Sequence, residues 1–329
     1  MRDLGTAGRI LLRCPEDAVL SFYNSPYPGH SLGTSVDIYP EGDGWDLPVV
    51  SPVSGVVRVV RRLTMGRRTS FPSEDYDWAI AISPDADADV WVRVLHCRPE
   101  VREGQLVEQG ERLGHTIRSR FFCFWTGPHS HVDILRPGDF GRSTKSLPLV
   151  PLADSWKVEG SMQSVVEATV LSVHDDKAVC SPVSATGRCG DLVGHAAYDS
   201  GGQAIGVIDG GVPHYRRGGV HRCGSEPADR QVFVWGHCIG LVTQTHAGSL
   251  RYATTEGTQA TVNRTKMRGV SFFLYPNRRL VHGCVPLVLI PEARGGFHGL
   301  LSEGDSVTLR LTQVVREDDR SSPVRPLLT

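Results

Sequence analysis

Short apolar or alternating segments recur along the whole chain, and they predict strands. In a strand, successive side chains point to opposite faces, so alternation buries one face and exposes the other. The segments with this pattern are 9–13, 34–39, 49–60, 78–82, 90–97, 130–135, 165–174, 231–243, 270–275, 285–290 and 306–315. No segment has a convincing helical period, so we predict an all-β fold with antiparallel sheets.

A proline-containing stretch at 148–158 separates the strands into two groups, and we place a domain boundary there. The chain has 329 residues, which is long enough for two domains that each bury a core. We therefore predict one β domain over residues 1–150 and a second β-rich domain over 151–315. Residues 316–329 are charged and contain proline, which predicts a flexible tail.

Glycine and proline mark the expected turns. Residues 23–33 are rich in Pro, Gly, Ser and Asn and are predicted to form a loop. The Ser-Gly pair in the middle of 49–60 predicts a tight turn or a bulge between two apolar halves. Residues 103–114, EGQLVEQGERLG, predict a hairpin. The side chains expected to face inward there are Leu106, Val107 and Leu113.

Composition argues against several partners. The formal net charge is -1 and the basic residues are scattered, so neither nucleic acid nor an anionic membrane is implied. No stretch approaches the roughly 18 apolar residues of a membrane span, and residues 1–22 lack the apolar core of a signal peptide. The 8 cysteines lack the density of a secreted disulfide scaffold. We predict a cytoplasmic protein with reduced thiols.

Histidines at strand positions are the candidate chemistry. His129 and His131 are two residues apart at the strand predicted for 130–135, so their imidazoles project from one face. Asp37 lies inside an apolar strand, where an acid is costly unless it is paired, metal-bound or at an exposed edge. His96 ends another strand. Imidazole and carboxylate both bind Zn²⁺, although unrelated surface histidines and a satisfied strand-end histidine are the simpler explanations.

The second half offers weaker candidates. His221 and Cys223 would share a strand face, and so would His282 and Cys284. A second metal site is conceivable, but no Cys-x-x-Cys pair supports it. Buried free thiols and scattered histidines are the favoured interpretation.

Four segments of the first half, in order, resemble the lysostaphin/LytM-type zinc metallopeptidases, which have a duplicated-hybrid-motif-like β domain. The segments are GTSVDIYP at 33–40, VVSPVSGVVRVV at 49–60, VLHC with VREGQLVEQGERLG at 94–114, and TGPHSHVDI at 126–134. The resemblance spans about 27–134 and implies an antiparallel β-sheet peptidase-like domain. The chain also looks like archaeal relatives, for which the usual bacterial wall substrate is absent.

The resemblance implies roles for individual residues. Asp37 and His131 become zinc ligands, and His96 and His129 become the catalytic histidines. The family's first ligand is a histidine four residues before the aspartate, and that position is Gly33 here. The nearest histidine is His30, an odd number of residues from Asp37, so a straight strand would send it to the wrong face. We predict a bend hinged at Gly33, which would complete a His30, Asp37 and His131 zinc site with water in the fourth position.

The implied activity is zinc-dependent hydrolysis of amide bonds in a peptide-containing substrate. Because Gly33 removes a ligand, the alternative is a degenerate binding or regulatory module on the same fold. A carrier domain is a third hypothesis, but a biotinyl or lipoyl carrier needs a lysine at the turn tip, and 103–114 has none. A phosphocarrier would use paired histidines without a metal. The second domain could bind substrate, cover the cleft or pair two copies into a homo-oligomer.

Overall fold

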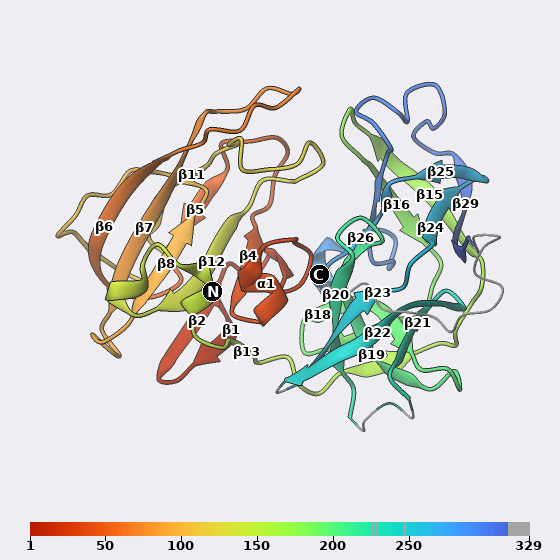
Figure 1. Cartoon of the computed structure of the whole chain (residues 1–329), viewed down its shortest axis with the longest axis horizontal. Helices are drawn as coiled ribbons and strands as arrows, with labels where there is room; N and C mark the ends of the chain where they lie inside the picture. The colour runs from red at the N-terminus through yellow and green to blue at the C-terminus, as the bar shows by residue number, and fades with distance from the viewer. Residues whose placement is uncertain (225–226, 228, 247, 315–329) are drawn as a thin grey trace. The chain divides into compact units, whose positions relative to one another are not determined.

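A computed structural model describes residues 1–224, 227, 229–246 and 248–314, and the predicted tail at 316–329 lies outside them. The chain forms two compact units. Met1–Phe22 and Tyr27–Leu152 make the first, and Tyr23–Pro26 and Ala153–Thr329 make the second. Both units consist almost entirely of antiparallel strands, which confirms the predicted fold class (Figure 1). The chain therefore passes between the units three times, at 22/23, 26/27 and 152/153.

The elements of the first unit are β1 (Arg2–Ala7), β2 (Ile10–Cys14), β3 (Val19–Ser21), α1 (Pro28–Leu32), β4 (Ser35–Tyr39), β5 (Pro48–Val50), β6 (Gly55–Thr64), β7 (Tyr76–Pro84), β8 (Trp91–Leu95), β9 (Cys97–Pro99), β10 (Leu106–Val107), β11 (Arg112–Thr116), β12 (Ser130–Leu135), the 3₁₀ turns η1 (Pro137–Asp139) and η2 (Ser143–Lys145), and β13 (Val150–Pro151). Seven strands form the largest sheet, in the order β10-β6-β7-β8-β12-β4-β3. Two three-stranded sheets, β13-β1-β2 and β5-β11-β9, complete the unit.

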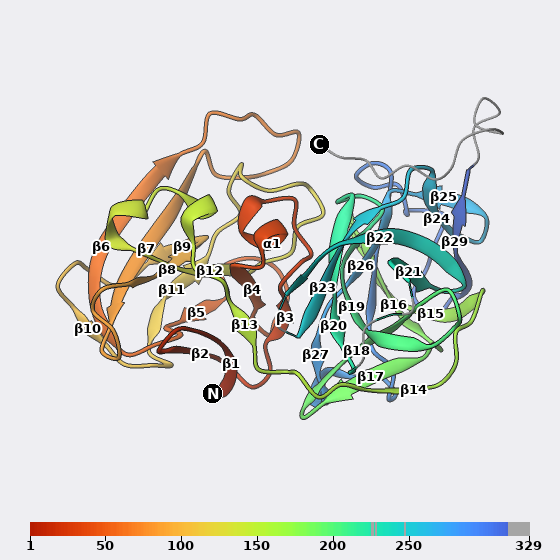
Figure 2. The same ribbon diagram turned by 60° about the horizontal axis from the view of Figure 1, so that its bottom comes forward.

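One face of the seven-stranded sheet is covered by buried apolar side chains. Its central strands β7, β8 and β12 run side by side in both Figure 1 and Figure 2. They bury a layer of β-branched side chains that are at most 1% exposed: Ile80, Ile82, Val92, Val94, Val132 and Ile134. Because these residues alternate along each strand, the residues between them project from the other face.

The other face carries polar residues at its centre. Residues directly opposite each other in antiparallel strands share a face. His131 of β12 is opposite Asp37 of β4 on one side and Leu95 of β8 on the other. Two residues along β12, Asp133 is opposite Arg93. The sheet register thus brings together side chains that are far apart in the sequence.

The hairpin predicted for 103–114 is wrong, because its strands β10 and β11 belong to different sheets. The two apolar halves of 49–60 are strands as predicted, β5 and β6, and they too belong to different sheets. Each segment thus connects one sheet to another. Val107 and Leu113 are buried as predicted, but Leu106 is 73% exposed. Glycine spacing fixes where a chain turns, while the pairing partner of each arm depends on long-range packing.

The predicted loop at 23–33 contains the one α-helix of the described residues, the five-residue α1. Pro28 opens it, which suits the first helical turn because proline lacks an amide hydrogen. Gly33 ends it in the left-handed conformation, with φ 68° and ψ 37°. Such a backbone suits glycine, which has no Cβ to clash. The hinge predicted at Gly33 is therefore present, as the cap of a helix.

The elements of the second unit are β14 (Lys157–Glu159), β15 (Val166–Val173), β16 (Ala178–Pro182), β17 (Thr186–Cys189), β18 (Leu192–Tyr198), β19 (Ala204–Val212), β20 (Arg217–Arg222), β21 (Gln231–Val234), β22 (His237–His246), β23 (Ser249–Thr254), β24 (Thr258–Val262), β25 (Thr265–Met267), β26 (Gly269–Phe272), β27 (Tyr275–Pro276), the 3₁₀ turn η3 (Asn277–Arg279), β28 (Leu287–Ile290) and β29 (Ser306–Gln313). The single strand predicted for 231–243 is two strands, β21 and β22, because the backbone turns at Trp235 and Gly236, both with positive φ.

Six strands of this unit close on themselves. The pairing runs β18-β21-β22-β23-β20-β19, and β19 pairs back with β18. Tyr252 is 1% exposed inside the unit and packs against glycines of neighbouring strands. A Cβ at Gly218 would lie 2.4 Å from the Tyr252 hydroxyl oxygen, so the close approach of these strands needs glycine there. Tyr23 is part of this unit, and its hydroxyl is 2.6 Å from Oγ of Ser249.

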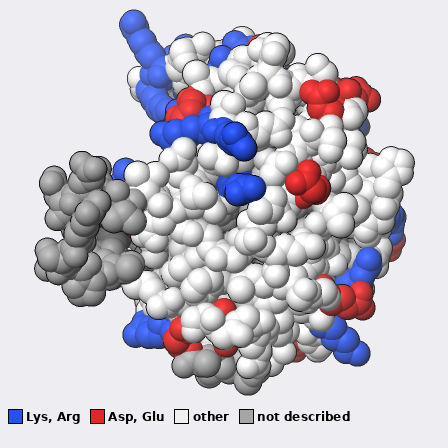
Figure 3. Space-filling model, turned by 90° about the vertical axis from the view of Figure 1, so that its right-hand side faces the viewer, with Lys and Arg blue, Asp and Glu red and all other residues white. Residues whose placement is uncertain are grey.

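Charge is sparse and mixed on the face shown in Figure 3, where small groups of basic and acidic side chains are separated by uncharged surface. The absence of a nucleic-acid partner stays a prediction. Within the described part of the chain, no helix is long and apolar enough to cross a membrane.

Candidate metal centre

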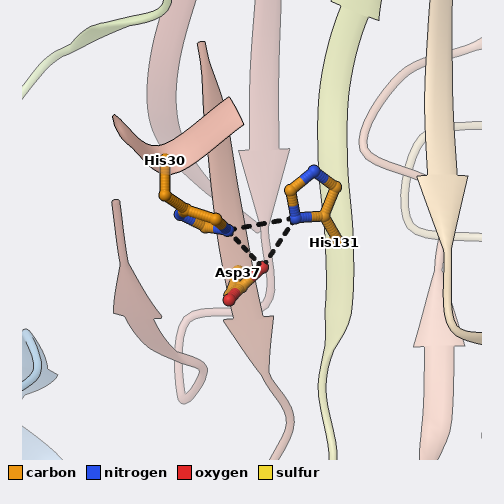
Figure 4. A group of neighbouring side chains, drawn as sticks. All are labelled: His30, Asp37 and His131. Atoms are coloured by element: carbon orange, nitrogen blue, oxygen red, sulfur yellow. Dashed lines mark hydrogen bonds and ion pairs between the residues drawn. The ribbon is translucent and has the colours of Figure 1, made fainter. Parts of the chain in front are cut away.

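Three buried side chains of the first unit meet at one point. Nε2 of His30 is 3.1 Å from Oδ1 of Asp37 and 3.1 Å from Nδ1 of His131, and that nitrogen is 2.9 Å from the same oxygen (Figure 4). The exposed fractions are 1%, 2% and 6%. Among the His, Cys, Asp and Glu residues that the structure describes, these form the one group whose ligand atoms could share a metal ion. The pairs proposed in the second half, such as His221 with Cys223, form no such group.

Each member of the triad is held by its own element. The sheet register places Asp37 of β4 opposite His131 of β12. His30 reaches them from α1, and its Nδ1 donates to the carbonyl oxygen of Phe22 at 2.9 Å. Gly29 lets the helix lie against β4, because a Cβ there would be 2.6 Å from Oγ of Ser35. Gly33 supplies no ligand, and the short helix before it brings His30 to the triad.

His129 and His96 lie beside the triad. Nε2 of His129 is 3.6 Å from Oδ2 of Asp37, the oxygen that the triad does not use, and its Nδ1 donates to the Gly127 carbonyl at 2.9 Å. The rings of His129 and His96 are 5.2 Å apart, and His96 is 6.2 Å from the ring of His131. The structure therefore brings together all five residues that the sequence singled out.

A cavity of about 360 Å³ opens next to this cluster. His96 and His131 border it together with the aromatic rings of Tyr27 and Phe121, and the loop at 141–144 forms another side. Tyr27 and Phe121 form one wall, where their rings stack with centroids 4.2 Å apart. The volume is at the lower end of the roughly 300–1,000 Å³ range of pockets that hold small molecules.

Family models match both halves of the chain. Residues 13–151 match the N-terminal domain of a domain of unknown function, DUF8155, and residues 167–285 match its C-terminal domain. Together the two matches cover most of the chain. The chain belongs to the DUF8155 family. All five clustered residues lie in the DUF8155 N-terminal domain.

No curated protein matches the chain. Two solved structures of lysostaphin are similar: an NMR solution structure, and a structure of the antimicrobial peptidase lysostaphin from Staphylococcus simulans. Each is 14% identical, with 57% of this chain and 86% of that chain covered and a TM-score of 0.24. A likeness this weak carries no argument about activity in the DUF8155 chain. The likeness to archaeal relatives stays a prediction.

The donor set of the DUF8155 N-terminal domain fits a cation. A carbonyl oxygen only accepts, so His30 carries a proton on Nδ1, and in the neutral ring the lone pair of Nε2 points at the triad. The carboxylate oxygen of Asp37 also only accepts. With His30 and His131 both neutral, no proton lies between Nε2 of His30 and Oδ1 of Asp37, and their lone pairs face each other at 3.1 Å. A metal ion between the three atoms would satisfy all of them.

The protonation states of Asp37, His131 and His129 also suit the binding of a cation. Burial opposes ionisation of Asp37, but the electrostatic effect of nearby His30 and His129 and the hydrogen bond from His131 outweigh it and hold the pKa of Asp37 well below its usual range. Burial lowers the pKa of His131, and it lowers the pKa of His129 to about 4. At pH 7 the carboxyl group is therefore ionised and these two imidazoles are neutral, which are the forms that bind divalent metals.

Sequence reasoning missed the residues behind the cluster. Asp77 accepts from Nδ1 of His96 at 2.6 Å and from Oγ of Ser119 at 2.7 Å. Arg93 pairs with Asp133, whose Oδ2 is 4.0 Å from Nε2 of His131. The available signal was a charged residue inside an apolar strand, as in WVRVL and SHVDIL. That pattern marks a buried charge but does not identify its partner.

Proposed function

We propose that the DUF8155 N-terminal domain of this chain is a zinc-dependent hydrolase that cleaves peptide or other amide bonds. The observation that carries the proposal is the convergence of Nε2 of His30, Oδ1 of Asp37 and Nδ1 of His131 within 4.8 Å in a buried site. Two imidazoles and one carboxylate suit zinc, and catalytic zinc sites use three protein ligands and keep a fourth position open.

The remaining residues of the cluster would perform the proton transfers. Zinc, when bound, lowers the pKa of water and polarises a carbonyl group. His96 and His129 lie next to the triad, and His96 borders the cavity. One of them would take the proton of the attacking water. The other would have to be doubly protonated to donate a hydrogen bond to the carbonyl oxygen as it gains charge, because Nδ1 of each ring already faces an acceptor. A cavity walled by Tyr27 and Phe121 would hold the substrate next to these groups.

The alternative of a degenerate binding module is motivated only by Gly33. His30 is close enough to complete the donor set, so that motivation is weakened. We further propose a peptide-containing substrate, a cytoplasmic location and a role for the second domain in pairing two copies.

The test is metal content combined with hydrolysis. Purified protein should contain about one zinc ion per chain and should cleave members of a peptide library. We expect His30→Ala to lose the zinc and the hydrolysis while the far-ultraviolet circular dichroism stays unchanged, because two remaining ligands hold zinc weakly. The matched control is His115→Ala, which removes a partly exposed histidine paired with Glu100 in the same unit and should keep both properties.

Two results would count against the proposal. Full zinc occupancy in His30→Ala would remove this residue from the centre. Zinc-loaded wild-type protein that cleaves no peptide in the library would favour the binding module instead.

A further inference from the structure

His96 has contacts to a carboxylate and to two aromatic rings. Its Nδ1 is 2.6 Å from Oδ2 of Asp77, and the side chains of the two residues are 4% and 2% exposed. Its ring also contacts Phe121 and Phe122, at centroid distances of 5.2 Å and 4.5 Å. Such contacts leave the imidazole little freedom to rotate or flip.

The backbone of His96 is also constrained. Its φ is 65°, which is uncommon for a residue other than glycine. Its amide donates to the Trp78 carbonyl at 3.2 Å, and its carbonyl accepts from the Ile117 amide at 3.1 Å. These two hydrogen bonds maintain a conformation that costs energy, and conformations of this kind cluster at functional sites.

The carboxylate of Asp77 is itself held in place by hydrogen bonds. Its Oδ1 accepts from the Trp78 amide at 2.7 Å, and its Oδ2 accepts from Oγ of Ser119 at 2.7 Å. A carboxylate can only accept, so the proton of neutral His96 lies on Nδ1 and the lone pair lies on Nε2, the far side of the ring. His96 borders the cavity next to the triad.

We propose that Asp77 and Ser119 are positioning residues that hold His96 with its Nε2 lone pair available to the cavity, so that His96 takes the proton of the attacking water. This inference rests on the proposed hydrolase function. His129 is backed by the Gly127 carbonyl instead of a carboxylate. A carboxylate behind the ring stabilises the imidazolium that forms when the proton is taken, and a carbonyl group does so less.

A buried Asp–His pair can also be purely structural, and the second unit contains one in His221 and Asp209, both 0% exposed, at 3.3 Å. The pair at His96 differs because the contact is shorter and the histidine borders a cavity. The experiment must therefore measure a property that would stay the same if the Asp77–His96 pair were purely structural.

Asp77→Asn provides that measurement. The Trp78 amide requires an acceptor at the Oδ1 position, so the oxygen of the substituted carboxamide takes that place and its NH₂ group faces Nδ1 of His96. The proton of His96 should then move to Nε2. We expect ¹⁵N spectra of the histidine rings to show a protonated Nδ1 in the wild-type protein and a protonated Nε2 in Asp77→Asn.

In kinetics, we expect Asp77→Asn to lower kcat by roughly 10²–10⁴-fold with little change in KM or zinc content. Ser119→Ala keeps the tautomer and should lower kcat less, by roughly tenfold. Asp46→Asn, at an exposed site that pairs with Arg98, is the control and should match the wild type.

The outcomes separate the two proposals. An unprotonated Nδ1 of His96 in the wild-type protein would overturn the positioning role without any variant having to fold. Unchanged kcat in a folded Asp77→Asn with the shifted tautomer would overturn it too. Wild-type protein that binds zinc and hydrolyses nothing would reject the hydrolase, while the tautomer measurement would still decide whether Asp77 orients His96.

Discussion

Arg93 and Asp133 are opposite charges in the interior of the first unit, with side chains 5% and 0% exposed. The guanidinium makes two parallel contacts to the carboxylate, at 3.0 Å and 2.6 Å, and Ser146 donates to the same carboxylate at 2.7 Å. Removing one charge of such a pair leaves the other desolvated and unpaired, which costs far more than the pair contributes.

We therefore predict that Arg93→Met lowers the free energy of unfolding by about 3–5 kcal/mol, as measured by urea denaturation. Arg98→Met is the control, because Arg98 pairs with Asp46 at the exposed surface and should change stability by less than about 1 kcal/mol. Equal effects of the two substitutions would show that burial does not decide the energetics here.

His195 of the second unit is 1% exposed and neutral, with Nδ1 3.0 Å from Oγ of Ser184. Burial lowers its pKa from 6.5 to about 4. As the pH falls, the unfolded chain therefore binds this proton before the folded protein does. The stabilising contribution is complete above pH 6.5 and is lost between 6.5 and about 4.

His195→Gln removes this titration, so the difference in unfolding free energy between pH 7 and pH 4 should shrink by up to about 3 kcal/mol. Denaturant titrations at several pH values test this. The exposed His174 gives the control, since His174→Gln should leave the pH dependence unchanged. An identical pH profile for His195→Gln and the wild type would mean that the pKa of His195 does not differ between the folded and the unfolded protein.

Elements differ in how much of their placement the local sequence determines. The strands β12 and β4 follow from alternation alone, but the placement of His131 beside Asp37 depends on the pairing of these strands and was expected only from the family resemblance. The helix α1 does not, because five residues are too few to show a period and helices this short depend on tertiary contacts. Asp77 was unpredictable for a related reason: it meets His96 only through the pairing of β7 with β8, which a single sequence does not reveal.

The strand β6 offers a test of close packing between strands. A Cβ at Gly55 would lie 2.2 Å from the carbonyl oxygen of Ser83 in β7, so the backbones cannot keep their spacing around a larger residue. We predict that Gly55→Ala lowers the melting temperature, with a loss of about 1–3 kcal/mol in the free energy of unfolding. Gly138→Ala is the matched control, because nothing lies within 4 Å of its Cβ position. Equal melting temperatures of Gly55→Ala and Gly138→Ala would contradict the close approach of β6 to β7 at Gly55.

The molecule cannot be divided by one cut in the chain. Tyr23–Pro26 belongs to the second unit although residues on both sides of it belong to the first. Tyr23 is 4% exposed there, and its ring would be 2.1 Å from a Cβ at Gly219. The predicted boundary at 150 was drawn from local composition, which cannot report a segment that packs with Ser249, 226 positions away.

A chain truncated after Leu152 should therefore lose protection in this segment. We expect fast amide hydrogen exchange at residues 23–25 in the truncated chain and slow exchange in the full chain. Adding the separately expressed 153–329 fragment is the control for specific loss and should restore slow exchange. Equal protection in the truncated and full chains would show that the segment holds its conformation without the second unit.

The short helix α1 would also affect the rates at which an ion binds and is released. His30 is the one donor of the triad that does not project from the sheet, and Gly33 is the joint between its helix and β4. An ion held by three residues that are at most 6% exposed would be released when one of these donors moves away from it. Opening of α1 is a smaller rearrangement than separation of β4 from β12. A chelator in solution should then remove the ion at a rate set by this local opening, independent of the chelator concentration once that is high.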